Sequence, residues 1–476
     1  MNRRGFLKAL TALGSSTAIS RALASDYAIT SQPSGFRETQ DRIEARAVRL
    51  DEVQYERPAI LPKVINVFLY GGPSELAGNL TNIAEIDFYS QTSYPSTLQP
   101  NVSGSVYTKN GFWGNAGGNL MESMLAAGDL SIYRTIHRVR DDNKAHGRSI
   151  TQNLVGSVDA GNPGIARTLA GVLAAHGAFG GRDLNTLFLP FVSFEGQSRI
   201  YSEGDVPTLI PAAVMPIALD PNLVGNPYQR AANSFLPVGS ADDMTLEALA
   251  ANVTAAYGNR YAEISRSLAN RARLDQYILS QFNRAMVDAA LPAGVVYANT
   301  RLGRALKAAV SLALMNPDTL FISINGAGPG WDDHNVALTN YPARMNDLMS
   351  SLSAAMAHLR ASNRNDIIIN VYGDFGRNVN INTTLGWDHG NNQNFYTLGG
   401  SGVAGRSLGK LVGRTQRIGT AYANRQFTAP TADSYQCEPF AIAASMFKYF
   451  GIQNPEVLTG GVSAIDEITP PNLRVA

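Results

Sequence analysis

Cysteine is nearly absent from this sequence, which has one, Cys437, among 476 residues. No disulfide bond can therefore form within the chain, even in an oxidising compartment. The sequence also has no haem-attachment or iron–sulfur cluster motif, which argues strongly against a redox protein carrying one of these cofactors. A chain of this length can instead bury a large apolar core, as one large domain or two.

Long apolar runs and an excess of charge of one sign are lacking too. After the N-terminal segment, no run of apolar residues is long enough to span a bilayer. Charged residues make up 16% of the chain, and its formal net charge is +1. No stripe of lysine and arginine indicates binding to nucleic acid. We therefore expect neither a membrane-spanning segment in the mature chain nor a nucleic-acid partner.

The N-terminus has the parts of a twin-arginine export signal. Arg3 and Arg4 come first, a mildly apolar stretch follows at residues 9–19, and residues 22–24, Ala-Leu-Ala, have the small-x-small pattern of a signal-peptidase site. We predict that residues 1–24 are the signal and that the protein works in the periplasm or outside the cell. The alternative is an amphipathic first helix. Removal of the signal would leave 35 basic and 38 acidic residues.

Short apolar runs that stop at turn residues alternate with segments of helical spacing. This alternation predicts an α/β fold with a mainly parallel sheet. The predicted strands are residues 64–70, 130–136, 186–194, 319–325 and 366–372. The predicted helices are residues 118–127, 145–154, 165–176, 244–290, 301–315, 342–362 and 437–450.

The domain organisation follows from the same pattern. Residues 25–62 have no clear periodicity and are expected to form an extended N-terminal segment. We expect residues 63–476 to form a single α/β domain. Residues around 195–295 begin with a stretch rich in Pro, Gly, Asn and Ser and continue with helical spacing, which indicates an inserted loop and helix segment.

Three of the predicted strands lead directly into loops that carry glycine and polar residues. These loops are residues 71–74, 326–334 and 373–377. In open α/β sheets, ligands bind beyond the carboxyl ends of the strands. We therefore expect the three loops to meet at one edge of the sheet, although they lie far apart in the sequence.

Aspartate and histidine, residue types that bind divalent metals, gather in the C-terminal half of the chain. Two of the six histidines, His334 and His389, lie there beside aspartates. Asp374 ends a predicted buried strand, where a carboxylate needs a cation or hydrogen bonds to offset its desolvation. The predicted ligands of a divalent metal, which could be Zn, Mg, Ca or Mn, are Asp332, His334, Asp374, Asp388 and His389.

Three further residues are candidates for catalysis. Ser74 follows two glycines at a strand end, where backbone N–H groups could approach a phosphate or sulfate and a metal could activate the hydroxyl as a nucleophile. Arg377, three residues after Asp374, could hold an anionic oxygen with two hydrogen bonds. His146 follows the strand at 130–136 after a charged loop, and a site role and a surface role are equally open for it.

Each of these candidates has a structural alternative. The sequence around Ser74, Gly-Gly-Pro-Ser, is a common turn. Asp374 could cap a helix that starts at Phe375, and residues 332–334 could cap the helix that follows them. Residues 388–389 could belong to a solvated turn.

Taken in order along the chain, these motifs resemble the domain-of-unknown-function family fifteen-oh-one, whose exported members belong with the alkaline phosphatase and sulfatase-like superfamily. The resemblance covers the whole mature chain and implies a sulfatase-like α/β core with helices on both faces. It also implies that Asp332, His334, Asp374 and His389 match metal ligands, and that Ser74 matches the region of a nucleophile that attacks phosphate or sulfate esters. The matching segments are residues 71–74, 330–334, 373–377 and 386–389, with His146 after the second strand.

Three positions depart from the catalytic relatives, which hold two metals. Ala77 stands where the family often has an aspartate, Phe375 stands where superfamily enzymes commonly have a ligand histidine, and Gly71 follows the first strand where they place an aspartate. One metal, or none, therefore fits as well as two. The favoured hypothesis is a metal-dependent hydrolase that acts on small anionic esters or polysaccharide-linked esters. The alternative is a non-catalytic binding or assembly protein on the same fold, and the oligomeric state stays open.

Overall fold

The chain divides into two compact units. Unit 1 comprises Met1–Arg46 and Ala218–Ala290, and unit 2 comprises Ala47–Ile217 and Leu291–Ala476. The segment Ala218–Ala290 overlaps the insertion predicted around 195–295, whereas the predicted signal at 1–24 lies outside the described residues. The computed structural model describes residues 50–73, 107–141, 143–196, 198–204, 217–220, 241–257, 273–274, 276–326, 330–417 and 428–475.

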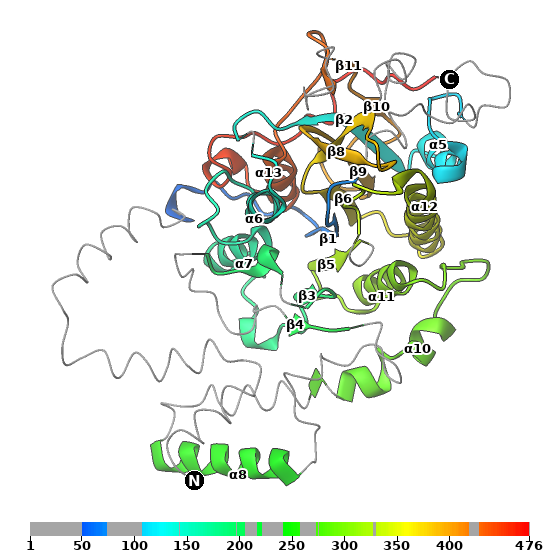
Figure 1. The fold of residues 1–476 in the computed structure, drawn as a ribbon. Helices are drawn as coiled ribbons and strands as arrows, with labels where there is room; N and C mark the ends of the chain where they lie inside the picture. Colours follow the sequence, from blue (N-terminus) through cyan, green and yellow to red (C-terminus); the bar gives the residue numbers. More distant parts are fainter. Residues whose placement is uncertain are drawn as a thin grey trace. The chain divides into compact units, whose positions relative to one another are not determined.

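A mixed eight-stranded sheet runs through the described part of the chain, with strand order β10-β2-β9-β6-β1-β5-β3-β4 (Figure 1). Strand β1 pairs in parallel with β5 and β6, β3 with β5, and β10 with β2. Strand β9 runs antiparallel between β2 and β6. The α/β class is thus confirmed, but the sheet is not uniformly parallel. The strands are β1 Lys63–Leu69, β2 Leu130–His137, β3 Phe191–Ser193, β4 Ile217–Ala218, β5 Phe321–Asn325, β6 Ile367–Gly373, β9 Asn392–Gly399 and β10 Leu411–Val412.

Four of the five predicted strands match β1, β2, β5 and β6 closely. The prediction for residues 186–194 is wrong over most of its length, because a 3-10 turn occupies Leu184–Thr186 and only β3 is extended. Leu189 has a positive φ of 51°, and Pro190 has no N–H to donate to a neighbouring strand. The ladder therefore starts only at Phe191.

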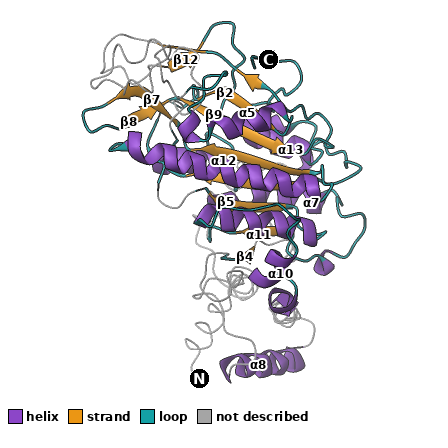
Figure 2. Ribbon diagram, turned by 90° about the vertical axis from the view of Figure 1, so that its right-hand side faces the viewer, coloured by secondary structure: helices purple, strands orange, loops and turns teal. Residues whose placement is uncertain are grey.

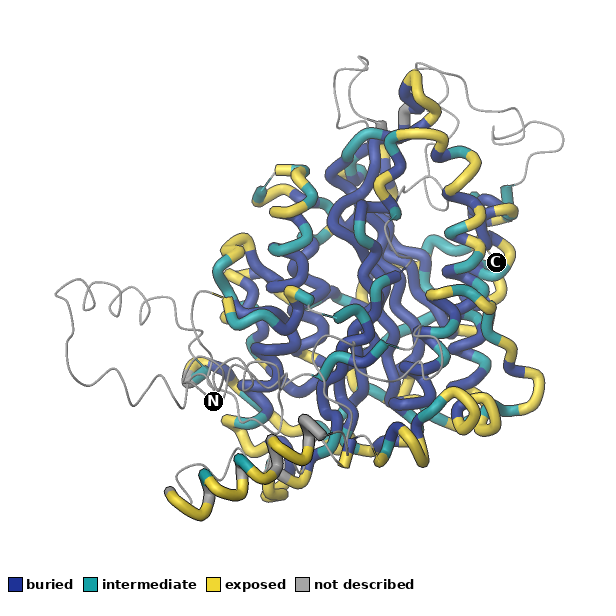
Figure 3. The backbone as a smooth tube through the Cα atoms, turned by 60° about the horizontal axis from the view of Figure 1, so that its bottom comes forward, coloured by how far each residue is buried: buried dark blue, intermediate teal, exposed yellow. Residues whose placement is uncertain are grey.

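Helices cover both faces of the sheet (Figure 2). On one face, residues of α7 and α13 such as Leu169 and Phe447 pack in a core with Phe68, Phe321 and Tyr372 of the strands. On the other face, α11 and α12 lie across the strands. The strands themselves are buried along almost their whole length (Figure 3). The helices are α5 Gly118–Ala126, α6 His146–Val155, α7 Ile165–Ala175, α8 Ala241–Tyr257, α10 Arg284–Ala289, α11 Arg301–Met315, α12 Ala337–Ala361 and α13 Phe440–Tyr449.

Shorter elements complete the described part of the chain. Two small antiparallel pairs are formed by β7 and β8 and by β11 and β12. Their bounds are β7 Gly376–Ile381, β8 Trp387–Gly390, β11 Thr415–Arg417 and β12 Thr428–Pro430. The remaining 3-10 turns are Leu50–Glu52, Gly114–Ala116, Arg199–Tyr201 and Pro455–Val457. Among all the residues that the structure describes, no helix combines the length and the apolar character needed to cross a bilayer.

Two of the capping alternatives fail in the structure. Phe375 is followed by the strand β7 and not by a helix, because apolar Val379 and Ile381 alternate with polar neighbours and are fully buried. Helix α12 begins at Ala337 after Val336, and no side-chain cap bonds to its first turn. Asp374 and residues 332–334 therefore do not cap helices.

A buried ion pair anchors the C-terminal segment to the sheet. Arg406 donates to Glu467 Oε1 (2.8 Å), to Gly399 O at the end of β9 (2.8 Å) and to Thr397 Oγ1 (3.0 Å). Tyr449 donates to the same Glu467 oxygen (2.5 Å). Both charged side chains are buried.

We predict that Glu467→Ala lowers the free energy of unfolding by about 3–5 kcal/mol, because it leaves the buried Arg406 charge without a carboxylate. The matched control is Asp433→Ala, which removes an exposed partner 3.6 Å from Arg414 and should change stability little. Urea unfolding of the two variants measures the difference. Equal losses would contradict the assignment of Glu467 as an anchor.

Candidate metal centre

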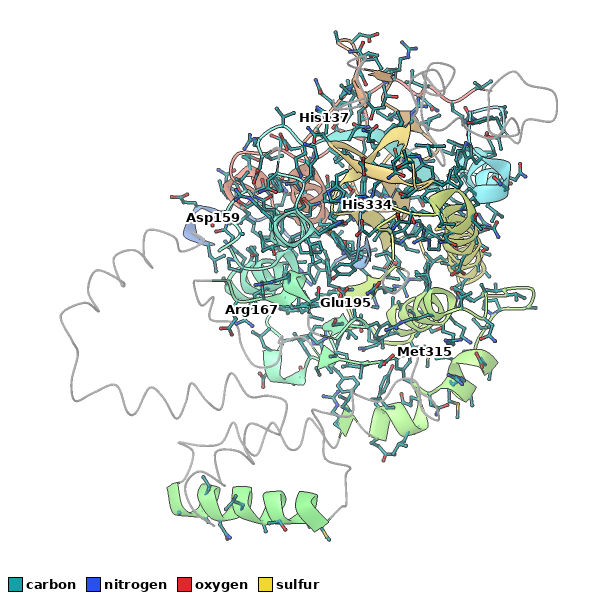
Figure 4. The ribbon with its side chains drawn as sticks, viewed as in Figure 1. His137, Asp159, Arg167, Glu195, Met315 and His334 are labelled. Carbon is teal, nitrogen blue, oxygen red and sulfur yellow. The ribbon has the colours of Figure 1, made fainter. Side chains whose placement is uncertain are left out.

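The loops after β1, β2, β5 and β6 meet at the carboxyl edge of the sheet, as the sequence predicted for three of them. Trp331 N donates to Tyr70 O (2.9 Å), and Gly71 N donates to Asp374 Oδ1 (2.9 Å). Because β9 runs antiparallel, it begins at this same edge, and β8 immediately precedes it. His334, labelled in Figure 4, lies between α6 and α12 in that view.

Four side chains converge at this edge and could hold a metal ion: His146, Asp332, His334 and His389. Asp332 Oδ1 lies 3.2 Å from His146 Nε2, 3.2 Å from His334 Nε2 and 3.9 Å from His389 Nε2. The two Nε2 atoms of His334 and His389 are 2.9 Å apart. Ligands at about 2.0–2.1 Å around a tetrahedral ion would be separated by about 3.3 Å, which is close to these distances.

Each of the three histidines directs its Nδ1 atom at an acceptor. His146 Nδ1 lies 2.7 Å from Asp374 Oδ2, His334 Nδ1 lies 3.2 Å from Asp388 Oδ1, and His389 Nδ1 lies 2.8 Å from Lys144 O. Carboxylate and carbonyl oxygens accept hydrogen bonds, so the proton of each neutral ring belongs on Nδ1. The lone pairs of all three Nε2 atoms therefore face the space around Asp332.

The four side chains place several hydrogen-bond acceptor atoms close together, with too few N–H or O–H groups to donate to them. Three Nε2 lone pairs and a carboxylate oxygen repel one another unless a cation lies among them. His146 Nε2 is buried and makes no hydrogen bond. Arg377 Nη1 approaches His334 Nε2 at 3.3 Å, and Arg377 Nη2 approaches Asp332 Oδ1 at 2.6 Å. The residues present thus fit a divalent ion with imidazole ligands.

Arg377 does not have the role that the sequence suggested. Its fully buried guanidinium donates from Nε to Gly72 O (2.8 Å), from Nη1 to Trp387 O (3.0 Å) and from Nη2 to Trp331 O (3.2 Å), as well as to Gly71 O. These bonds, with the one to Asp332, use every nitrogen of the side chain. Arg377 is therefore not free to clamp an anionic oxygen of a substrate and instead positions Asp332.

The other predicted residues divide into two sets. His146, an undecided candidate, joins Asp332, His334 and His389 in the four-residue group. Asp374 and Asp388, which the sequence predicted as ligands, are outside this group and accept from His146 and His334. In metal sites, such partners fix the tautomer and orientation of the ligand ring. The predicted nucleophile, Ser74, lies outside the described residues.

Asp374 is fully buried and is held from several directions. Its Oδ1 accepts from Gly71 N, and its backbone carbonyl accepts from Asn153 Nδ2 (2.9 Å) and Arg138 Nη2 (3.4 Å). The sequence reasoning missed Asn153 and the carbonyl of Lys144. Asn153 sits inside a predicted helix without any motif, and a backbone carbonyl leaves no signal in a sequence.

Aromatic rings support the four-residue group. Phe375 cannot bind a metal, but its ring packs 4.8 Å from that of His146 and 4.4 Å from that of His389. Tyr341 packs against Trp331 (5.7 Å) and Trp387 (5.6 Å), which precede Asp332 and Asp388. These contacts limit the movement of the side chains that carry the polar groups.

Neighbouring charges, hydrogen bonds and burial shift the pKa values of residues in the four-residue group. The hydrogen bond to Asp374 raises the pKa of His146, against the opposing effect of burial. Burial would raise the pKa of Asp332, but the hydrogen bond and charge of Arg377 lower it below its usual value. Burial, the charge of Arg377 and the two neighbouring histidines lower the pKa of His389 to about 3. His389 is therefore neutral at physiological pH, as a metal ligand must be.

Comparison with known proteins supports the family resemblance over part of the chain. Residues 238–469 match a family model described as a protein of unknown function, DUF1501. This segment includes Asp332, His334 and His389 but not His146. No curated protein matches the sequence.

One similar solved structure is the crystal structure of Ps i-CgsB in complex with k-i-k-neocarrahexaose. The two chains share 10% identity over 83% of this chain and 74% of that chain, with a TM-score of 0.35. A likeness at this score shows neither a shared fold nor a shared ligand.

We predict that Asp374→Asn weakens Zn²⁺ binding about 10–100-fold, because the amide holds the His146 ring less firmly than the carboxylate. Asp388→Asn should cost less, since Asp388 is partly exposed and its contact with His334 is longer. Asp159→Asn, on the surface, is the matched control. Competition with a chromogenic chelator measures all three affinities. Unchanged affinity in Asp374→Asn would contradict the orienting role.

The raised pKa of His146 predicts opposite pH dependences for stability and for metal binding. In the metal-free protein, His146 stabilises the fold below its unfolded pKa of about 6.5, and this contribution is lost as pH rises through its raised folded pKa. A metal requires the neutral ring, so Zn²⁺ affinity should rise over the same interval, by about tenfold per pH unit for one competing proton.

Isothermal titration calorimetry at several pH values between 5.5 and 8.5, in buffers of matched ionic strength, would measure the Zn²⁺ affinity. Asp374→Asn removes the charge that raises the pKa of His146. The rise in affinity should therefore shift to lower pH in this variant. An affinity that does not change with pH would exclude His146 as a ligand.

Proposed function

We propose that this protein is an exported hydrolase of phosphate or sulfate esters that uses one divalent metal. The metal would be held by His146, His334 and His389, with Asp332 beside it. The observation that carries this proposal is the convergence of three Nε2 lone pairs on a carboxylate oxygen, with each Nδ1 atom fixed by an acceptor. The resemblance to sulfatase-like proteins supports ester hydrolysis, and residues 1–24 support export.

Three imidazoles and one carboxylate favour Zn²⁺ over the other candidate ions. Mg²⁺ and Ca²⁺ prefer oxygen ligands, and carboxylate-rich sites suit Mn²⁺ better than imidazole-rich ones. One four-residue group among the described residues is also consistent with one metal, as Phe375 in place of a second histidine suggested. We therefore propose one Zn²⁺ per chain.

Different side chains of the protein would have different roles around the ion. A bound Zn²⁺ supplies Lewis-acid polarisation of the ester and activates water. Asp332 is held by Arg377 and half exposed, and its lowered pKa keeps it ionised, so its carboxylate would accept a hydrogen bond from the attacking water and orient it. The positive charge of Arg377 offsets negative charge that develops nearby. Ser74 would follow the turn that Arg377 and Asp374 hold at Gly71 and is the proposed alternative to water as nucleophile.

A non-catalytic role is the second candidate, and one observation favours it. Asp332 Oδ1 lies 3.2 Å from the Nε2 atoms of both His146 and His334, which is close to the spacing of ligands around one ion, so it could fill the fourth ligand position. A zinc site with four protein ligands is closed and structural, whereas a catalytic one keeps an open position. In that case the metal would stabilise a binding or assembly protein in the periplasm or at the cell surface.

Hydrolysis of 4-nitrophenyl phosphate and 4-nitrophenyl sulfate by the zinc-loaded protein distinguishes the two candidates. We expect turnover of at least one ester and a loss of at least about 100-fold in His334→Ala, because removing a ligand removes the ion. His176→Ala, at an exposed histidine outside the four-residue group, is the control. Stoichiometric zinc that raises the Tm without any turnover would support the structural role. Absence of bound zinc would exclude both the zinc-dependent hydrolase and the structural zinc site.

A further inference from the structure

Two exposed apolar residues beside the metal centre have a strained backbone. Val336 and Leu385 have φ angles of 50° and 61°, and their exposed fractions are 49% and 42%. Positive φ is rare for residues other than glycine, asparagine and aspartate, and a β-branched valine there is an outlier. Of the other non-glycine residues with positive φ in the described ranges, Leu189 is buried and Asn363 is of a type that tolerates it.

Backbone hydrogen bonds place the two residues side by side. Val336 N donates to Thr384 O (3.0 Å), and Ala337 N donates to Leu385 O (2.8 Å). We call the pair formed by Val336 and Leu385 the apolar rim. It belongs to the turn between β7 and β8 and to the segment that leads into α12.

Hydrogen bonds and short chain segments connect the apolar rim to His334, a candidate metal ligand. His334 O accepts from Thr384 Oγ1 (2.8 Å) and Asn382 Nδ2 (3.1 Å), and His334 lies two residues before Val336. On the other side, Leu385 lies three residues before Asp388, which contacts the His334 ring. The pair thus lies on the two hydrogen-bonded segments that carry His334 and Asp388.

Close packing prevents the two segments from relaxing. A Cβ atom on Gly386 would lie 2.1 Å from the carbonyl carbon and oxygen of His334. Trp387 N also donates to Asp333 O (2.7 Å), on the buried side of the same contact. The strain at Val336 and Leu385 is therefore held in place by the surrounding structure, which is typical of functional sites.

The rim carries no charged side chain. Its exposed neighbours are Asn335, Thr383 and Thr384. Arg377, the buried cation of the centre, has every nitrogen engaged within the protein. Among the described residues, the rim and the exposed residues next to it in the sequence therefore offer apolar surface, hydroxyl groups and an amide to a bound molecule.

We propose that the apolar rim binds the apolar group of the molecule that occupies the metal centre. The substrate is then an ester with an aryl or alkyl group, and not an ester carried on a polyanionic chain. This inference rests on the metal centre of the proposed function, and it adds the substrate class. Apolar contact with the rim contributes affinity in proportion to the area removed from water.

Binding of two hydroxamates to the zinc-loaded full chain tests the rim independently of turnover. Acetohydroxamate and benzohydroxamate share the metal-binding group and differ in apolar size. We expect the wild type to bind benzohydroxamate about tenfold more tightly, as partial burial of a ring predicts. In the double variant Val336→Gly, Leu385→Gly this ratio should fall to about one to three, with the acetohydroxamate Kd unchanged.

Two controls keep the outcome unambiguous. Glycine adopts positive φ without cost, so the double variant should fold, and its Tm is measured alongside. Ile468→Gly removes another exposed apolar side chain and should keep the tenfold ratio. If zinc and both hydroxamates bind but their Kd values are equal in the wild type, the rim inference is overturned while the metal centre stands. If zinc does not bind at all, both are overturned.

Discussion

The buried guanidinium of Arg377 is the constraint on which the rest of the site depends. Four backbone carbonyls from two loops and the strand β8, together with Asp332, point their oxygens at this one cation. Burial of a charge is costly unless acceptors surround it, and here they do. Because the same cation binds the turn after β1, the loop before α12 and the strand β8, the positions of these segments cannot vary independently. A lysine could not replace it, since an ammonium group has no planar fork to reach several carbonyls at once.

Around this cation the site uses aspartates in two different ways. Asp332 is exposed and faces the histidine Nε2 atoms, whereas Asp374 is buried and faces the Nδ1 atom of His146. The two carboxylates thus lie on opposite nitrogens of one ring. Phe375 packs against His146 and His389 as an apolar support. The position next to the buried Asp374 therefore contributes packing to the four-residue group and no polar atom.

The sequence predicted the buried strands β1, β2, β5 and β6 because each is a short apolar run that ends at glycine or a polar turn. It also predicted that their loops would meet, which follows from the geometry of parallel strands. The sequence did not predict β7, β8 and β9. Asparagine residues in these segments obscure the alternation of apolar and polar residues that marks a strand. The antiparallel direction of β9 is visible only from its pairing with β2 and β6. The sequence also could not separate Asp332, which lies in the four-residue group, from Asp374, which lies outside it, because their different burial is visible only in the structure.

The four-residue group comes from distant parts of the chain, and this has a consequence for assembly. His146 precedes Asp332 by 186 residues and His389 by 243, and the sheet strands β2, β5, β6 and β9 bring these residues together. Bringing such distant segments together requires the closure of long loops, which occurs late in folding. A fragment that lacks either His146 or the segment from Asp332 to His389 would therefore lack part of the four-residue group, so the group is complete only when both parts of unit 2 are present and folded together.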